Sequence, residues 1–202
     1  MSIDPPPPLR NPRAARTRKA LFDAAARLFV RHGYENTTMA DIAAEAGASR
    51  RTAFNYFPNK GDIPMLWVRQ IADQAIDEAA ASFSSDVAKH VRAYFRVISE
   101  VMESEPDLSR QMMLGWTAAL GPARYESQLL ADLTPILVAG RDAGLIDQGV
   151  PVDVIARALS DIFQGAVFRW VREHDTVLHE MVDDAIALVV HAVVTNAAQD
   201  PA

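Results

Sequence analysis

The sequence predicts an all-α protein in which a small basic helical domain precedes a larger acidic one. Apolar residues recur at three- and four-residue steps along most of the chain, which is the spacing of amphipathic helices. No segment alternates apolar and polar residues well enough to predict a strand. The charge is uneven: residues 10–69 hold eleven Lys and Arg against five Asp and Glu, whereas the rest of the chain holds nine against twenty-one. We therefore expect the two parts to have different functions.

The composition limits the class of protein further. With 202 residues, of which 50% are hydrophobic, the chain can bury a sizeable core. It has no cysteine, which excludes disulfides, thiolate metal sites and cysteine nucleophiles and is typical of a reducing compartment. The chain contains no apolar run of about eighteen residues, and its first residues, MSIDPPPPLRNPR, lack the apolar segment of a secretory signal. We therefore expect a cytoplasmic protein without a membrane partner.

The first elements of the chain are a tail and one helix. Residues 1–11 include four consecutive prolines and predict a disordered, polyproline-type tail. The apolar stripe between Asn11 and His32 predicts an amphipathic helix, which Gly33 ends.

Two short helices should follow. The segment Thr38-Met-Ala-Asp41 has the form of a capping box, with Asp in the place of Glu, and predicts a helix that continues through Ala46. Gly47 stops that helix. Ser49 can then cap a second short helix over 50–56.

Six longer helices are predicted after residue 60. Pro135 is expected to kink one of them, and Pro64, which lies in the first two turns of another, predicts an irregular start there. The predicted helices cover about 60–82, 86–104, 107–119, 122–143, 152–173 and 176–197.

The two short helices, joined by a tight turn that contains glycine, have the form of a helix-turn-helix. Their apolar residues are spaced to face the first helix; these are Ile42, Ala43, Ala46, Ala53 and Phe57. Arg50 and Arg51 stand at the N-terminal end of the second short helix, which is the end that such motifs insert into the major groove. Since arginine can bond to guanine through two parallel hydrogen bonds, these two are the predicted base-contacting residues.

Other polar residues flank the two arginines. Hydroxyl groups and an ammonium group at Thr37, Thr52, Tyr56 and Lys60 are suited to phosphate contacts, which fix the register of a protein on DNA without reading its sequence. Asn55 could contact adenine or the DNA backbone.

The segment AARLFVRHGYENTTMADIAAEAGASRRTAFNYFPNKGDI resembles the TetR-type (TetR/AcrR) family of transcriptional regulators. The resemblance runs from Arg16 to about Leu66. It implies phosphate contacts from the four flanking residues, base-contacting positions at the two arginines, and repression as the mode of regulation. Phe54 departs from the family pattern, which usually has Tyr there.

The acidic part of the chain has apolar residues on two sides of its last two predicted helices. One side can pack on the subunit's own core, and the other predicts a two-fold homodimer through residues about 152–197. Full burial of both helices in the core of a monomer is the alternative.

The resemblance also implies a small-molecule effector pocket in the acidic part. The candidate residues for the pocket wall have thioether and aromatic side chains. Such side chains adapt to irregular apolar ligands, but they are also common in a hydrophobic core. The candidates are Phe95, Met102, Met112, Met113, Trp116, Phe163 and Trp170, with Asp161 and Gln164 for polar contacts.

Together these features predict a helix-turn-helix DNA-binding domain over residues 12–58 and a helical effector-binding and dimerisation domain over 59–202. The expected function is that of a dimeric repressor that binds a palindromic double-stranded operator and is released by a small apolar effector. An architectural DNA-binding dimer without an effector is the alternative. The histidine and carboxylate residues of segment 173–180 fit no zinc-ligand spacing, and no catalytic motif is present. Neither an enzymatic activity nor a cofactor is therefore expected.

Overall fold

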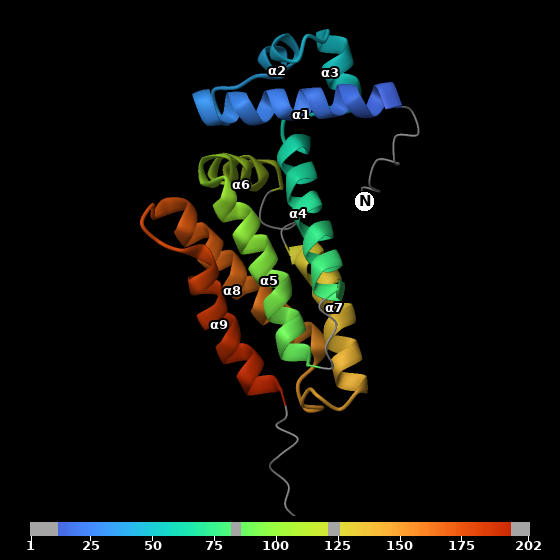
Figure 1. The fold of residues 1–202 in the computed structure, drawn as a ribbon, viewed down its shortest axis with the longest axis vertical. Coiled ribbons are helices and arrows are strands. Elements are labelled where there is room, and N and C mark those ends of the chain that lie inside the picture. The colour runs from blue at the N-terminus through green and yellow to red at the C-terminus, as the bar shows by residue number, and fades with distance from the viewer. Residues whose placement is uncertain (1–11, 82–85, 121–125, 195–202) are drawn as a thin grey trace, which may run out of the picture. The chain divides into compact units, whose positions relative to one another are not determined.

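The computed structural model describes residues 12–81, 86–120 and 126–194, which are almost entirely helical (Figure 1). Within these ranges the only β pairing is an isolated bridge between Ile146 and Val194. The helices are α1 (Pro12–His32), α2 (Met39–Glu45), α3 (Arg50–Tyr56), α4 (Asp62–Ala81), α5 (Val87–Ser104), α6 (Pro106–Leu120), α7 (Glu126–Asp142), α8 (Val152–Arg172) and α9 (Leu178–Val193).

The all-α prediction is confirmed, and the helix boundaries differ from the predicted ones by a few residues. Several predicted residues lie outside the described ones: the tail 1–11, residue 82 at the end of the helix 60–82, residues 122–125 of another helix and residues 195–197 of the last. The start near Lys60 is a tighter turn than the α-helix that follows, because the N–H groups of Asp62 and Ile63 donate to carbonyls three residues back. Helix α4 begins at Asp62, so Pro64 lies in its first turn, where a backbone N–H has no intrahelical acceptor to lose.

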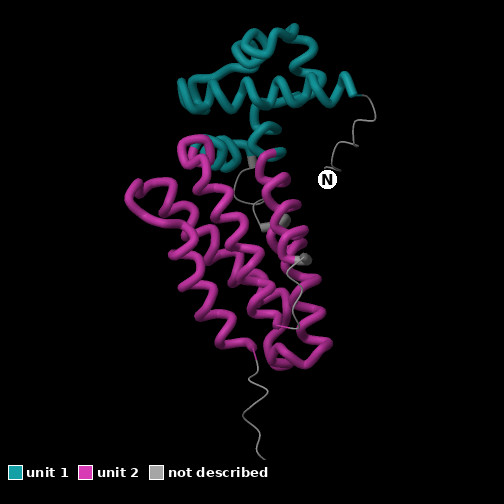
Figure 2. The backbone as a smooth tube through the Cα atoms, in the orientation of Figure 1, with its two compact units in different colours: residues 1–66, 111–119 teal, residues 67–110, 120–202 magenta. Residues whose placement is uncertain are grey.

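The chain divides into two compact units (Figure 2). The N-terminal unit contains the residues up to Leu66 together with Gln111–Ala119. The C-terminal unit contains Trp67–Arg110 and the residues from Leu120 onward. Helices α4 and α6 therefore each contribute residues to both units.

Helix α1 provides one packing surface of the N-terminal unit. Its buried residues recur at helical spacing and are Leu21, Ala24, Ala25, Leu28 and Phe29. Helix α2 packs on α1, and α3 packs on α2. Arg27 and Arg31 of α1 both donate to the same carboxylate oxygen of Glu45 in α2, at 3.0 and 2.9 Å. The pair α2 and α3 is thus fixed against α1.

Tyr34, in the loop after α1, is held from several sides within the N-terminal unit. Its backbone N–H donates to Gln111 Oε1 at 2.8 Å, and its ring meets Phe29 edge-on with a centroid distance of 5.1 Å. The ammonium of Lys60 lies 4.1 Å from the ring centroid. A Cβ atom added to Gly115 would lie 2.4 Å from a carbon of the same ring. The ring therefore has little freedom to move.

In the C-terminal unit, α8 packs against α7 and α9, and α5 packs against α9 and α7. Buried side chains follow one stripe of α5 and a wider one of α8. The hydroxyl of the fully buried Tyr94 in α5 donates to Asp132 of α7 at 2.7 Å. Burial is the largest cause of the raised pKa of the Tyr94 phenol. The phenol therefore keeps its proton and donates its hydrogen bond to α7.

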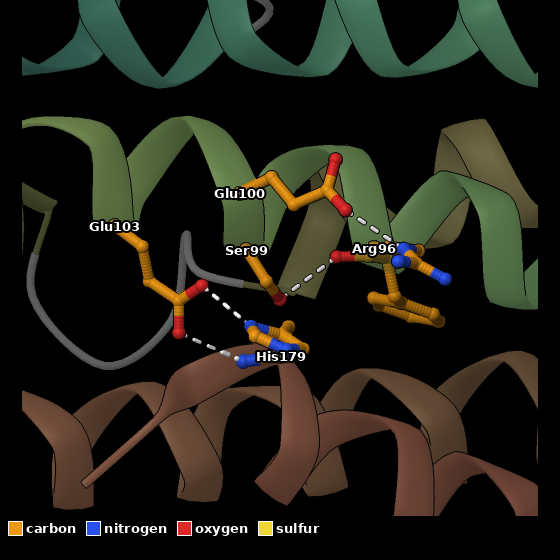
Figure 3. A network of polar contacts seen from close by, with 6 residues as sticks. Arg96, Ser99, Glu100, Glu103 and His179 are labelled. Atoms are coloured by element: carbon orange, nitrogen blue, oxygen red, sulfur yellow. Dashed lines mark hydrogen bonds and ion pairs between the residues drawn. The ribbon is translucent and has the colours of Figure 1, made fainter.

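A histidine–carboxylate pair joins the start of α9 to the end of α5 (Figure 3). Nδ1 of His179 lies 2.7 Å from one oxygen of Glu103, and the backbone N–H of His179 donates to the other oxygen at 3.1 Å. The hydrogen bond with Glu103 raises the pKa of His179 above its ordinary value of 6.5. Arg96 and Glu100 form a separate ion pair on α5, at 2.7 Å.

This pair predicts a pH-dependent contribution to stability. Because the pKa of His179 is raised by folding, its contribution is fully present below about pH 6.5, the value for an unfolded histidine, and is lost as the pH rises through the higher folded value. We expect the stability difference between wild type and His179→Gln, measured by urea unfolding, to shrink between about pH 6 and pH 8.5. His174→Gln, in the exposed turn before α9, is the control. An unchanged difference across this range would contradict the assignment.

None of the described helices is both long enough and apolar enough to cross a lipid bilayer.

Candidate nucleic-acid interface

Two side-chain caps define α2 and α3. The Thr38 side chain accepts from the backbone N–H of Asp41 at 3.2 Å, and the Asp41 carboxylate accepts from the backbone N–H of Thr38 at 2.9 Å. The hydrogen bonds from Thr38 also lower the pKa of Asp41, so the capping box stays charged. At the next helix, Ser49 Oγ accepts from the backbone N–H of Thr52 at 3.1 Å. The predicted caps are therefore formed.

The turn between α2 and α3 depends on Gly47. Its φ is +65°, in the left-handed region that residues with a side chain adopt at a cost. The N–H of Gly47 donates to Ala44 O and that of Ala48 donates to Ala43 O, which closes the end of α2. The chain then reverses tightly enough for α3 to start at Arg50.

Apolar contacts anchor α3 from its inner side. Ala53 is fully buried and Phe57, the residue after the helix, is 1% exposed. The guanidinium of Arg18 in α1 lies 5.8 Å from the centre of the Phe57 ring. The inner side of α3 therefore packs against the rest of the unit, and its other side is exposed to solvent.

The open side of α3 forms a basic surface that we call the reading face; it consists of Arg50, Arg51, Phe54 and Asn55, all of them exposed. In the part of the chain that the structure describes, no hydrogen bond or ion pair occupies the guanidinium of Arg50 or Arg51. Phe54 is 48% exposed and adds an apolar ring to this face. Such a ring can contact a thymine methyl group, whereas the tyrosine usual in the family would carry a hydroxyl.

Thr52 and Tyr56 lie at the border of the reading face and are half-buried. The Thr52 hydroxyl is 2.8 Å from Ser49 Oγ, so it takes part in the cap of its own helix. Both side chains are on the same short helix as the two arginines, as predicted from the sequence.

Thr37 and Lys60 turn their polar groups inward in this structure. Thr37 is 3% exposed, and its hydroxyl donates to Gly33 O at 2.9 Å. The Lys60 ammonium donates to Tyr34 O at 2.7 Å and to Thr37 O at 2.9 Å. Burial lowers the pKa of Lys60. Their phosphate contacts therefore stay a prediction, beside a structural role that residue type alone did not reveal.

The candidate effector residues are divided between the two units. Phe95, Met102 and Phe163 are buried in the C-terminal unit, where the rings of Phe95 and Phe163 lie 5.0 Å apart. Met112, Met113 and Trp116 are also buried, but they belong to the N-terminal unit.

The two polar candidates on α8 differ. Asp161 is exposed, because a residue two positions from the buried Phe163 lies almost opposite to it on a helix. Gln164 is half-buried, and its Nε2 is buried without a hydrogen-bond partner among the described residues.

Within the described ranges, no group of three or more His, Asp or Glu side chains is arranged to hold a metal ion. The sequence did not predict the hydrogen bonds of Gln111 and Glu103. Their partners, Tyr34 and His179, stand 77 and 76 positions away along the chain.

Comparison with known proteins places the N-terminal part of the chain in a family. Residues 21–63 match the model of the bacterial regulatory proteins of the tetR family. The HTH-type transcriptional repressor LfrR of Mycolicibacterium smegmatis is 32% identical over 146 residues, which cover 72% of this chain and 67% of LfrR. The HTH-type transcriptional regulator RutR of Escherichia coli is 30% identical over 129 residues, or 61% of this chain and 60% of RutR.

A solved structure resembles most of the chain. It is that of Thermus thermophilus FadR, a TetR-family transcriptional repressor, in complex with lauroyl-CoA. The match has a TM-score of 0.72 and 26% identity, and it covers 92% of this chain and 99% of FadR.

Proposed function

Because this chain belongs to the TetR family of transcriptional regulators, we propose that it is a dimeric repressor that binds a palindromic operator and responds to a small, largely apolar effector. The observation that carries the proposal is the reading face of α3. It places Arg50 and Arg51 in solvent on a helix whose start is capped and whose inner side is anchored.

The reading face has the chemistry that major-groove recognition needs. Two guanidinium groups at the N-terminal end of a helix can form paired hydrogen bonds with guanine O6 and N7. Asn55, one helical turn after Arg51, can bond to adenine or to the DNA backbone. The surplus of positive charge over residues 10–69 favours approach of DNA from this side of the chain.

Arg51→Ala tests the base contact. Operator sequences would first be selected from random DNA with the wild-type protein. We expect the variant to bind the selected operator about tenfold more weakly while its affinity for random DNA changes much less, because a lost base contact removes discrimination. Fluorescence anisotropy at two salt concentrations measures both affinities. Arg92→Ala, which removes an exposed arginine from the C-terminal unit, is the matched control. Equal operator-to-random ratios for wild type and Arg51→Ala would refute this contact.

Exposed apolar side chains on α8 and α9 support the homodimer. Val154 is 50% exposed, Phe168 is 42% exposed and Leu188 is 75% exposed. A second copy of the same helices would remove this surface from water, and a two-fold axis would present two reading faces to the two halves of a palindrome.

Leu188→Glu tests this interface. Since Leu188 is 75% exposed in its own subunit, the substitution should leave the fold unchanged and raise the dissociation constant of the dimer by about tenfold or more. Light scattering with size-exclusion chromatography over a range of concentrations measures this constant. Glu180→Gln, an exposed change on the same helix, serves as the control. A variant that dimerises as tightly as wild type would place the interface elsewhere.

The response to an effector follows from a population shift. A ligand that favours the DNA-free arrangement of the dimer by about 2–3 kcal/mol would weaken operator binding by about 30- to 150-fold. The FadR relative supports this part of the proposal, because it was solved with a bound acyl-CoA.

A further inference from the structure

Arg110, in the first turns of α6, has a guanidinium group that the C-terminal unit largely removes from water. Its side chain is 13% exposed. Its Nε is buried and has no hydrogen-bond partner among the described residues. A positively charged group in this position normally has an acidic or carbonyl partner, because an unpaired buried charge is unfavourable.

The neighbours of Arg110 compensate this charge only in part. The guanidinium lies 4.7 Å from the ring centre of Trp170 in α8, a cation–π contact with a side chain that is 2% exposed. Its one acidic neighbour among the described ion pairs is Asp107, at 3.7 Å, and that carboxylate side chain is 81% exposed. A distant, solvated ion pair of this kind contributes little.

The group missing from this arrangement is an acceptor. Arg110 offers a planar fork of N–H donors, which matches the two oxygens of a carboxylate. The side chain of Arg110 is not fully enclosed, since 13% of it stays exposed.

We propose that Arg110 binds the carboxylate of the effector, which is therefore a small apolar carboxylic acid. The apolar part of the ligand is carried over from the proposed effector, because the Trp170 ring, which is 2% exposed, covers the guanidinium and not the ligand. The acidic charge of the chain outside residues 10–69 repels anions in general, so binding of an acid requires a local cation such as this one. This inference rests on the proposed effector response and adds the class of ligand.

The test compares acids with the alcohols of the same shape. Full-length protein is titrated with decanoate and 2-naphthoate, and with 1-decanol and 2-naphthalenemethanol. Binding is measured by calorimetry, and release of the selected operator by anisotropy. We expect at least one acid to bind about tenfold or more tightly than its alcohol, as loss of a charged hydrogen-bonded pair would predict. The preferred acid should also release the operator.

Two variants separate recognition from structure. Arg110→Gln should abolish the preference for the acid and leave the affinity for the alcohol unchanged. Without ligand it should unfold at the same urea concentration as wild type or a higher one, since it removes a poorly compensated charge. Asp107→Asn removes the competing carboxylate and should strengthen binding of the acid.

The outcomes distinguish failure of the Arg110 assignment from failure of the proposed effector response. If acids and alcohols both release the operator with equal affinity, the effector response stands and the assignment of Arg110 is wrong. If Arg110→Gln keeps the preference for the acid, the assignment is also wrong. If no probe binds while operator binding is intact, the carboxylic acid class is rejected. An intact preference for the acid without release of the operator would support Arg110 as the binding residue and contradict the proposed response.

Discussion

Gly115→Ala is expected to lower the free energy of unfolding by about 2–3 kcal/mol, although alanine is the better helix former by about 1 kcal/mol. The new methyl group would lie 2.4 and 2.5 Å from two carbons of the Tyr34 ring and 2.8 Å from Pro64 Cγ. Tyr34 cannot yield easily, because its N–H is bound to Gln111 and its ring is in contact with Phe29. The packing strain should therefore outweigh the gain in helix propensity.

Gly165→Ala is the matched control for that substitution. Gly165 is also inside a helix, α8, but no atom lies within 4 Å of an added Cβ. Alanine there should stabilise an isolated subunit by about 0.5–1 kcal/mol, so the two variants, both made together with Leu188→Glu to keep the proposed dimer apart, are expected to differ in sign. Urea unfolding followed by circular dichroism at one protein concentration gives both values. A stabilised Gly115→Ala variant would show that the Tyr34 ring is free to move.

Lys60→Met is expected to cost about 3 kcal/mol, because it leaves two part-buried carbonyl oxygens, and the exposed carbonyl of Glu35 at 3.4 Å, without their charged donor. The two part-buried carbonyls are those of Tyr34 and Thr37, which accept from Lys60 Nζ at 2.7 and 2.9 Å. The contact between the ammonium and the Tyr34 ring, at 4.1 Å, is lost as well. Methionine keeps most of the length of the side chain, so the change removes mainly the charge.

The same variant separates a structural role of Lys60 from a phosphate contact. If the role is structural, the variant unfolds at a lower urea concentration than wild type. At low temperature, where the variant is still folded, its DNA affinity then depends on salt nearly as that of wild type does. If stability is unchanged and the salt slope falls by about one unit, Lys60 contacts phosphate instead, as the family resemblance implies. Lys89→Met, which changes a lysine side chain that is 76% exposed, is the control for loss of charge.

The reading face could be predicted from the sequence because its determinants are local. The caps at Thr38 and Ser49 act on residues three positions away, and the turn at Gly47 involves its immediate neighbours. Once these were identified, helical periodicity placed Arg51 on the side opposite to Ala53 and the start of the helix placed Arg50 at its exposed N-terminal end.

The roles of Thr37 and Lys60 could not be predicted in the same way. A hydroxyl and an ammonium fit phosphate by their chemistry, but the carbonyl oxygens that they meet belong to the loop after α1. Sequence does not show which acceptor a long side chain will find. The contacts of Tyr34 with Gln111 and of His179 with Glu103 depend on tertiary packing over 77 and 76 positions.

The candidate effector-binding residues show a different limit of prediction from the sequence. Thioether and aromatic residues mark buried positions well, and those that were predicted are buried. Their type does not tell which compact unit they belong to, and three of them lie in the N-terminal unit. Arg110 was not among the candidates, because an arginine in a helix is usually a solvated residue and only its packing against Trp170 distinguishes it.

The division of the N-terminal unit into two stretches of sequence has a consequence for synthesis of the protein on the ribosome. Residues up to Leu66 emerge first, but the acceptor for the Tyr34 N–H, Gln111, and the neighbour of Gly61, Ala119, are made only after the whole of segment 67–110. At translation rates of about 5–20 residues per second, the nascent chain waits for seconds before this unit can be completed. A nascent repressor should therefore acquire full affinity for DNA only after α6 has left the ribosome, when much of the C-terminal unit is already made.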